Sequence, residues 1–343
     1  MSRPDINFRI DPSSLPPEDV LFGSTPAMRE VLNTISRTSD TELPVLIRGE
    51  TGTGKEMVAR YVHANSNLRN GPFVKVNCAA IPIHLLESEL LGYEKGAFTS
   101  AGESKPGLVE LAGGGTLFLD EIGDMNSSLQ SKMLHFLQDG RYVRVGGLEE
   151  RRARVRIVCA TNSDLEQGVR EGTFRADLFY RIDVITLRLS PLRERREDIP
   201  RLCEHFREKL CKRFGRTTAP LSELTLHLLE QWPWSGNIRE LENWVMREIV
   251  LGLHEALSVE LSRHCATAST TGANEFSGRL KQASRESARA AERALILKRL
   301  EANHWNRRKT SHDLNISYRS LLYKLREAGV PSIRHRRADR AVD

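Results

Sequence analysis

The sequence predicts an α/β fold in which a mostly parallel sheet is covered by helices, followed by an all-helical subdomain and a small all-α C-terminal domain. Short apolar β runs alternate with helical patterns between Leu21 and about residue 190, as in sheets that are buried on both faces. The β pattern disappears after Pro191, and helical periodicity replaces it. Basic residues then gather in the last part of the chain, which indicates a separate unit with a partner of its own.

Length and composition describe an ordinary globular protein. The 343 residues suggest two or three domains, and 39% of them are hydrophobic. A disulfide-stapled miniature is excluded, while disorder and a membrane bundle are disfavoured. No apolar run approaches the ~20 residues that span a bilayer, and residues 1–20 lack the apolar stretch of a signal peptide. We therefore expect a cytoplasmic protein with no membrane partner.

The net charge is unevenly divided along the chain. Lys and Arg number 51 against 45 Asp and Glu, a net of +6. Residues 276–343 hold 17 against 7, a net of +10, which leaves residues 1–275 with 34 against 38, a net of −4. A basic end of this kind indicates either a nucleic-acid partner or a solvated charged face, and charge alone leaves both open.

Cysteine usage points to neither a disulfide framework nor a zinc site. The five cysteines are odd in number, scattered and without a Cys-x-x-Cys pair: Cys78, Cys159, Cys203, Cys211 and Cys265. We expect them to be reduced and buried.

Each element follows from a local pattern. Residues 1–20 are rich in Pro, Asp and Ser and predict a disordered leader. Strands are expected at 44–48, 73–77, 115–120 and 155–160, and a helix at 56–63, within an α/β domain over 21–190. Helical periodicity over 198–262, interrupted at 232–236, predicts a helical subdomain over 191–264. The small polar residues of 266–274 predict a linker over 265–278, and 279–343 form the last domain.

A glycine-rich loop lies between the first strand and the first helix. Its backbone N–H groups can curl around phosphate oxygens, and its lysine can reach the β- and γ-phosphates. The alternative is a glycine-rich turn that contains a lysine by chance. Glu56 stands where a magnesium-binding Ser or Thr is usual. The loop consists of Gly49, Glu50, Thr51, Gly52, Thr53, Gly54 and Lys55.

Two adjacent carboxylates end the strand that begins at Thr116. Asp120 can hold Mg²⁺ and Glu121 can act as general base toward a water molecule. An Asp-Glu pair alone is usually a solvated turn, but together with the glycine loop it predicts nucleotide binding and hydrolysis. Asn77 and the pair Thr161-Asn162 end two further strands at the same edge. They can orient Glu121 or sense the γ-phosphate, or simply cap the strands, and position leaves both open.

The C-terminal pattern predicts a helix-turn-helix. A helical stretch at 291–302 is followed by residues 306–314, a turn at 315–316 and a last helix at 317–328, whose apolar stripe faces inward. Its outward residues suit the major groove, namely Tyr318, Arg319, Ser320 and Lys324. Arg307, Arg308 and Lys309 suit the DNA phosphates. The alternative is a helical oligomerisation module.

Taken together, these motifs resemble the bacterial enhancer-binding proteins, AAA+ ATPases that activate RNA polymerase carrying sigma-54. Residues 21–262 resemble the central domain of that family, and 292–328 its Fis-like DNA-binding domain. The family's phosphate loop ends in Gly-Lys-Glu, so Glu56 is normal there. The resemblance implies an AAA+ P-loop fold with a helical lid, ATP and Mg²⁺ as cofactors, a hexameric ring, and upstream double-stranded DNA and sigma-54 polymerase as partners.

One loop resembles the family's GAFTGA element, which touches sigma-54. It comprises Gly96, Ala97, Phe98, Thr99, Ser100 and Ala101. Phe98 and Thr99 match the contact positions, while Ser100 replaces a glycine. This change keeps open a second reading, a DNA-binding regulator or repressor on the same scaffold that lacks sigma-54 remodelling. A third is an AAA+ remodeller of another substrate.

The resemblance also implies roles for single residues. Arg175 and Arg181 match the arginine fingers, which act on a neighbouring subunit's ATP; surface ion pairs are the alternative. Arg239 matches sensor II, Thr161-Asn162 match sensor I, and Asn77 matches the residue that restrains the catalytic glutamate. Since only about 20 residues precede the ATPase pattern, we expect control by a separate inhibitor or co-activator rather than by an attached sensor.

Overall fold

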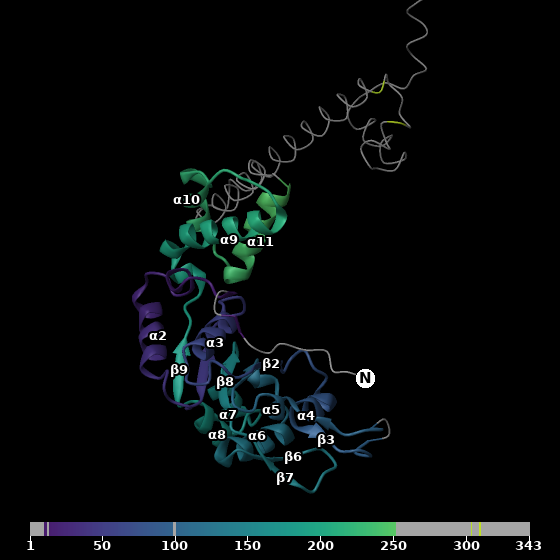
Figure 1. The fold of residues 1–343 in the computed structure, drawn as a ribbon. Coiled ribbons are helices and arrows are strands. Elements are labelled where there is room, and N and C mark those ends of the chain that lie inside the picture. Colours follow the sequence, from purple (N-terminus) through teal and green to yellow (C-terminus); the bar gives the residue numbers. More distant parts are fainter. Residues whose placement is uncertain (1–9, 12–13, 99–100, 252–302, 304–308, 310–343) are drawn as a thin grey trace, which may run out of the picture. The chain divides into compact units, whose positions relative to one another are not determined.

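A five-stranded parallel sheet forms the centre of the ATPase domain (Figure 1). The computed structural model describes residues 10–11, 14–98, 101–251, 303 and 309. The strand order is β2-β5-β8-β1-β9, and every pair is parallel. The strands are β1 (Val45–Arg48), β2 (Phe73–Asn77), β5 (Thr116–Asp120), β8 (Arg156–Thr161) and β9 (Ile185–Arg188). The predicted α/β class with a parallel sheet is confirmed.

Alternating side chains of the strands enter two different cores. In β5, Leu117 and Leu119 pack on one face and Phe118 on the other. This alternation is what a strand buried on both faces requires. The Phe118 face is covered by α1 (Glu18–Leu21), α2 (Pro26–Arg37) and α3 (Lys55–Ala64). The other face is covered by α4 (Ile83–Leu91), α5 (Leu108–Leu111), α6 (Ser127–Asp139), α7 (Leu165–Glu171) and α8 (Ala176–Ile182).

Two small antiparallel ribbons project from the α/β core. One pairs β3 (Gly92–Tyr93) with β4 (Lys105–Pro106), and the other pairs β6 (Arg141–Val143) with β7 (Glu150–Arg152). The ribbons meet at a bridge between Tyr93 and Val145. A short 3₁₀ helix, η2 (Ile122–Asp124), follows β5 directly.

The lid is all-helical, as predicted, and has its own core. Two 3₁₀ helices, η3 (Leu192–Glu194) and η4 (Arg196–Asp198), lead into α9 (Ile199–Phe214), α10 (Glu223–Gln231) and α11 (Asn237–Leu251). Trp234 is 1% exposed in this core, and its indole N–H donates to the carbonyl oxygen of Leu229 at 2.7 Å. Ser222 caps α10 by accepting a hydrogen bond from the backbone N–H of Thr225.

Ordered structure begins before Leu21, because α1 starts at Glu18 and Val20 packs against the lid core. The chain divides into two compact units, Met1–Cys265 and Ala266–Asp343. Cys78, Cys159 and Cys203 are free and buried, whereas Cys211 is free but only partly buried. Cys265, the whole of the predicted linker and all of the predicted helix-turn-helix except Lys309 lie outside the described residues.

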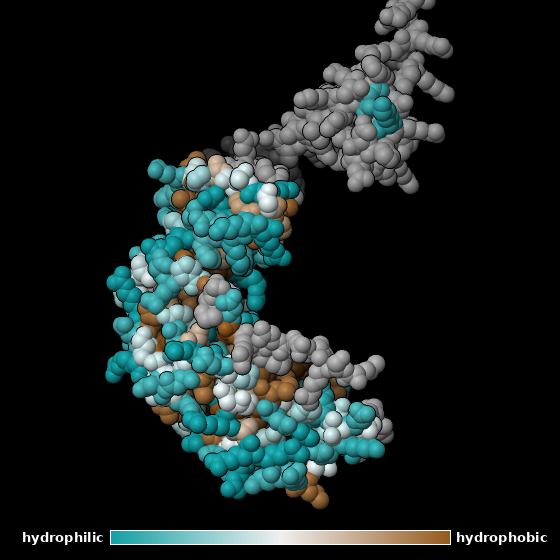
Figure 2. Space-filling model, in the orientation of Figure 1, coloured by the Kyte–Doolittle hydropathy of each residue, from teal (hydrophilic) through white to brown (hydrophobic). Residues whose placement is uncertain are grey.

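The surface drawn in Figure 2 is predominantly hydrophilic. Within the described part of the chain, no helix combines the length and the apolar character needed to cross a membrane. Leu148, at the tip of the β6–β7 ribbon, is the most exposed of the large apolar side chains that the structure describes.

Candidate functional site

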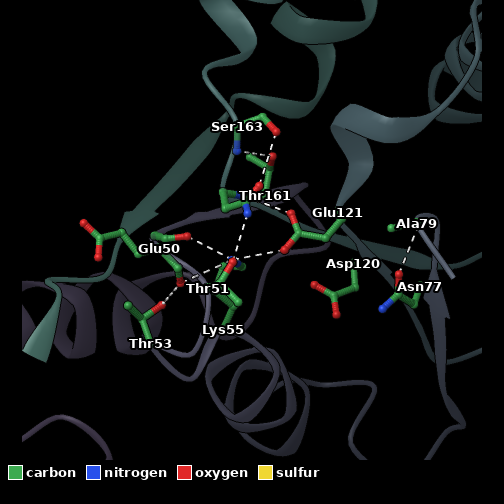
Figure 3. A network of polar contacts seen from close by, with 12 residues as sticks. Glu50, Thr51, Thr53, Lys55, Asn77, Ala79, Asp120, Glu121, Thr161 and Ser163 are labelled. Carbon is green, nitrogen blue, oxygen red and sulfur yellow. Dashed lines mark hydrogen bonds and ion pairs between the residues drawn. The ribbon is translucent and has the colours of Figure 1, made fainter. Parts of the chain in front are cut away.

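The glycine-rich loop joins β1 to α3 at the carboxyl edge of the sheet (Figure 3). Gly52 and Gly54 have φ angles of 83° and 97°, in the left-handed region that glycine enters without penalty. Helix α3 begins at Lys55, so its N-terminal N–H groups and its positive dipole end face this loop. The geometry suits phosphate binding.

Lys55 places its ammonium group inside the loop. The side chain is 7% exposed, and Nζ donates to the carbonyl oxygen of Gly49 at 2.9 Å. Nζ also lies 3.3 Å from Oε1 of Glu121. Within the loop, the Thr53 hydroxyl donates to the carbonyl oxygen of Glu50 at 2.8 Å. The predicted phosphate-binding cation and the predicted general base therefore meet at one point.

Glu121 is held by the neighbouring strand end. Its Oε2 accepts a hydrogen bond from the backbone N–H of Asn162 at 3.0 Å. The amide group of Asn162 in turn donates to the Thr51 hydroxyl at 3.0 Å, so it connects β8 to the loop. Glu121 itself has φ 52° and ψ 56°, a left-handed conformation that is uncommon for residues other than glycine.

Asp120 and Glu56 have different environments. The Asp120 carboxylate is 16% exposed and lies 3.8 Å from Nζ of Lys75. Burial raises the pKa of Asp120, and the Lys75 charge opposes that shift. Glu56 is turned away from the loop toward Lys75, at 2.6 Å, and Arg60, at 2.8 Å. Burial opposes its ionisation, but these hydrogen bonds hold the pKa of Glu56 below its usual value.

The other strand-end residues make local caps. Asn77 pairs beside Asp120 in the sheet, and its Oδ1 accepts the backbone N–H groups of Ala79 and Ala80, both at 3.1 Å. The buried Thr161 hydroxyl accepts the N–H of Ser163 at 3.0 Å. In this structure Asn77 and Thr161 therefore cap the ends of their strands, and their catalytic roles stay predictions.

Arg175 and Arg181 lie at opposite ends of α8. Arg175 donates to both carboxylate oxygens of Asp177, at 3.0 and 2.7 Å, and to the Ser131 hydroxyl at 3.1 Å. Arg181 donates to the backbone oxygens of Leu137 and Gln138 near the end of α6. Both guanidinium groups therefore bind α6 or α8 rather than the phosphate loop of their own chain.

The lid touches the phosphate loop directly. Arg239 is exposed in the first turn of α11, with its backbone N–H 3.4 Å from the carbonyl oxygen of Gly52. Arg193 and Asn237 donate hydrogen bonds to the Glu50 carboxylate. These bonds lower the pKa of Glu50 to about 2, and the bond from Arg193 has the larger effect. Sequence reasoning missed Arg193 and Asn237, because a lone arginine and a helix-start asparagine carry no local signal.

The GAFTGA-like loop is part of the connection between β3 and β4. Gly96 has φ 83°, and its N–H donates to the carbonyl oxygen of Ala101 at 2.9 Å. Phe98 is 38% exposed and packs on Tyr93, with ring centroids 4.8 Å apart. Ala97 contacts the other ribbon, because a Cβ added at Gly146 would lie 2.7 Å from that of Ala97. Thr99 and Ser100 lie outside the described residues.

A charged cluster missed by sequence reasoning joins the two ribbons. Arg144 is 9% exposed and binds Glu94 at 3.1 Å and Glu110 at 2.7 Å. Arg151 adds contacts to the same two carboxylates at 3.5 and 3.9 Å. No motif marks these positions, since the charges lie far apart in the sequence.

Of the predicted DNA-binding residues, the structure describes Lys309, which is exposed. The others lie outside the described residues: Arg307, Arg308, Tyr318, Arg319, Ser320 and Lys324.

Comparison with known proteins now decides the family. Residues 21–188 match the sigma-54 interaction domain, 193–277 the AAA+ ATPase lid domain, and 287–327 the bacterial regulatory proteins of the Fis family. The chain is 43% identical over 315 residues to the regulatory protein AtoC of Escherichia coli, covering 90% of this chain and 68% of AtoC. It belongs to the sigma-54-dependent transcriptional activators. This activator thus has an AAA+ ATPase domain of the ATP-binding type and a Fis-type helix-turn-helix.

Other similar proteins support the same family. The activator is 49% identical over 241 residues to the DNA-binding transcriptional regulator NtrC of Rhizobium meliloti, covering 70% of this chain but only 50% of NtrC. The crystal structure of NtrX from Brucella abortus with ADP has a TM-score of 0.67 and 33% identity, covering 90% of this chain and 69% of that one. NtrX with ATP matches equally, with a TM-score of 0.66.

Proposed function

We propose that this activator binds upstream DNA, hydrolyses ATP, and uses that hydrolysis to remodel the closed complex of sigma-54 RNA polymerase into an open complex. One observation carries the hydrolytic part. Lys55 at the start of α3, the adjacent pair Asp120 and Glu121 at the end of β5, and Asn162 after β8 converge on the glycine-rich loop. The NtrX complexes with ADP and ATP support a nucleotide at the equivalent place.

Each residue has a distinct task. Lys55 neutralises phosphate charge from within the loop. Glu121 orients the attacking water and accepts its proton, and the Asn162 N–H fixes the carboxylate that does so. The bond from Asn162 to Thr51 keeps this strand end in register with the loop.

The residues present also fit Mg²⁺. Asp120 offers a partly buried carboxylate at the edge of the sheet, the oxygen donor that Mg²⁺ prefers. Glu56 is committed to Lys75 and Arg60, so Asp120 with the ATP phosphates would hold the ion. When bound, Mg²⁺ would neutralise charge that develops on the transferred phosphate.

We further propose a ring, hexameric as in the family, in which Arg175 and Arg181 act on the neighbour's ATP. Their contacts to α6 and α8 of their own chain support action in trans. Phe98 and Thr99 would press on the polymerase complex. The C-terminal domain would hold the ring at enhancer DNA in the cytoplasm.

The Glu121→Gln variant tests the hydrolytic core. The amide keeps the size of the side chain but cannot accept the proton, so kcat should fall roughly 10²–10⁴-fold while ATP still binds. Steady-state ATPase assays and fluorescent ATP titration measure the two quantities. Glu171→Gln, on the exposed face of α7, is the matched control and should hydrolyse normally. Unchanged turnover in Glu121→Gln would remove Glu121 from this role.

Ser100 favours one second candidate, a DNA-binding regulator that lacks remodelling. Serine replaces the second glycine of the family's loop there, and glycine is the residue that enters the left-handed region of φ without penalty. That candidate predicts normal ATP hydrolysis and site-specific DNA binding without open complexes.

A further inference from the structure

Three successive carbonyl groups of the phosphate loop point at the lid. The Thr51 oxygen accepts from Nδ2 of Asn237 at 3.1 Å, and the Gly52 oxygen accepts from the backbone N–H of Ile238 at 3.0 Å. The Thr53 oxygen accepts from Nη2 of Arg195 at 3.3 Å. Every donor belongs to the segment that starts the lid or to the first turn of α11.

These contacts fix the opposite ends of the same peptide groups. In a planar trans peptide, the C=O and the following N–H point in opposite directions. With the oxygens of Thr51 and Thr53 held by the lid, the N–H groups of Gly52 and Gly54 point away from it. N–H groups so directed are the donors that a phosphate-binding loop uses.

The side chain of Glu50 joins the same attachment. Arg193 donates to both of its carboxylate oxygens, at 2.8 and 2.6 Å, and Nδ2 of Asn237 donates to Oε2 at 3.2 Å. Glu50 therefore offers its side chain to the lid and only its backbone oxygen to the loop.

Asn237 is the centre of this attachment. It is fully buried, and its φ of 55° places it in the left-handed region, which asparagine tolerates better than most residues. Its Oδ1 accepts the N–H of Leu192 at 2.8 Å, so one amide group joins the start of the lid, the start of α11 and the loop. The approach is close, since a Cβ at Gly52 would lie 2.2 Å from the carbonyl oxygen of Gly236.

We propose that Asn237 and Arg193 are positioning residues: through Glu50 and the loop carbonyls, they hold the phosphate-binding N–H groups in the orientation that captures nucleotide. Any displacement of the lid then alters phosphate affinity directly, besides any contact that the lid makes with ATP. This inference rests on the proposed function, because it assumes that the loop binds ATP.

The Asn237→Asp variant in the full chain tests the proposal. Aspartate keeps the size, the tolerance of positive φ and the acceptor for Leu192, but it replaces the donor with an oxygen that faces Glu50 and the Thr51 carbonyl. Fluorescent ADP and ATP titrations should both show affinity weakened roughly ten- to hundredfold, because the loop contacts phosphates common to the two. The melting temperature is measured alongside.

Two further variants separate positioning from stability. Arg193→Met removes the exposed ion pair without touching the buried amide, and it should weaken both nucleotides about three- to tenfold. Arg201→Met is the control: it breaks a lid-surface ion pair with Asp19, at 3.4 Å, that does not reach the loop, and affinity should stay unchanged. Glu50→Gln added to Asn237→Asp restores a donor toward residue 237 and should recover part of the lost affinity.

The outcomes distinguish the two proposals. If wild type fails to bind ATP, the proposed function falls. If wild type binds ATP while Asn237→Asp and Arg193→Met bind ADP as tightly as Arg201→Met, the positioning role falls and the proposed function stands. If Asn237→Asp lowers the melting temperature, the affinity of Arg193→Met relative to Arg201→Met decides whether the positioning role stands.

Discussion

Glu121 occupies a left-handed backbone conformation, at φ 52°, directly after a regular strand. Such conformations cost of order 1–3 kcal/mol and persist where surrounding contacts enforce them. Here the sharp change of direction brings the carboxylate back to Asn162 and Lys55 instead of continuing outward with β5. The strained residue and the proposed general base are therefore the same.

His63 makes the stability of the ATPase domain depend on pH. It is fully buried and bonded to the Thr116 hydroxyl at 2.9 Å. Burial, assisted by the charge of Arg156, lowers its pKa from 6.5 to about 4. Between these values the unfolded chain binds more protons than the folded chain, so stability falls as pH drops through this window. The loss from pH 7 to pH 5 should be about 2 kcal/mol.

Urea denaturation of wild type and His63→Asn at both pH values measures this loss. The variant keeps a hydrogen-bonding group near the Nδ1 position but does not titrate, so it should lose about 2 kcal/mol less than wild type between pH 7 and pH 5. An equal loss in both proteins would show that His63 does not titrate as described.

The site divides into residues that sequence predicts and residues that it does not. Lys55, Asp120 and Glu121 follow from spacing, because a parallel sheet collects its strand ends at one edge. Asn237 and Arg193 reach Glu50 only once the lid packs on the loop. In the sequence, Glu50 is 143 residues from Arg193 and 187 residues from Asn237. No local pattern encodes that packing.

At the scale of elements, strands β1, β2, β5 and β8 begin and end within one residue of their predicted limits, because their apolar runs are buried on both faces. Strand β9 was not predicted, since its four residues follow a helix closely and are only partly buried at the edge of the sheet. The β6–β7 ribbon has only three residues in each strand, and charged residues supply four of the six, so it gives no clear apolar alternation. Strand β9 and the β6–β7 ribbon therefore form because of tertiary contacts, which an alternating pattern in the sequence does not reveal.

The charged cluster between the ribbons should control the order of the GAFTGA-like loop. Arg144→Met leaves Glu94 and Glu110 with the longer ion pairs of Arg151 and with a hydrogen bond from the Tyr142 hydroxyl to Glu110 at 3.3 Å. Loss of a mostly buried cation of this kind destabilises locally by about 2 kcal/mol. Hydrogen exchange of residues 92–98 should become at least roughly tenfold faster.

Arg141→Met is the control for this experiment. It removes an exposed ion pair from the same ribbon, to Glu150 at 3.0 Å, and surface pairs of this type contribute little. Equal exchange rates in Arg144→Met and Arg141→Met would contradict the role of the cluster.

At the scale of the whole molecule, the net charge of +6 is the sum of −4 for residues 1–275 and +10 for residues 276–343. The acidic part contains the proposed nucleotide site, and the basic part contains the residues that match the Fis family. The charge asymmetry therefore follows the proposed division of tasks, in which the acidic part binds nucleotide and the basic part binds DNA.

The proposed ring predicts complementation between defective subunits. Lys55→Ala removes the phosphate cation, and Arg181→Ala removes a proposed finger, so each variant alone should lose at least roughly 10³-fold in ATPase rate. In a mixture, subunits of the first kind can supply Arg181 to the intact loop of the second. Random pairing makes about a quarter of the interfaces functional, and activity should recover accordingly. A mixture as inactive as its components would contradict action in trans.

Open-complex formation tests the central claim most directly. Purified activator, sigma-54 RNA polymerase and a promoter with an upstream binding site are combined, and permanganate reactivity reports melted DNA. Wild type with ATP should give melted promoter, whereas wild type without ATP and Glu121→Gln with ATP should not. Site-specific DNA binding and normal ATP hydrolysis by wild type without promoter melting would contradict the account, and recovery of melting by Ser100→Gly would assign that failure to the loop.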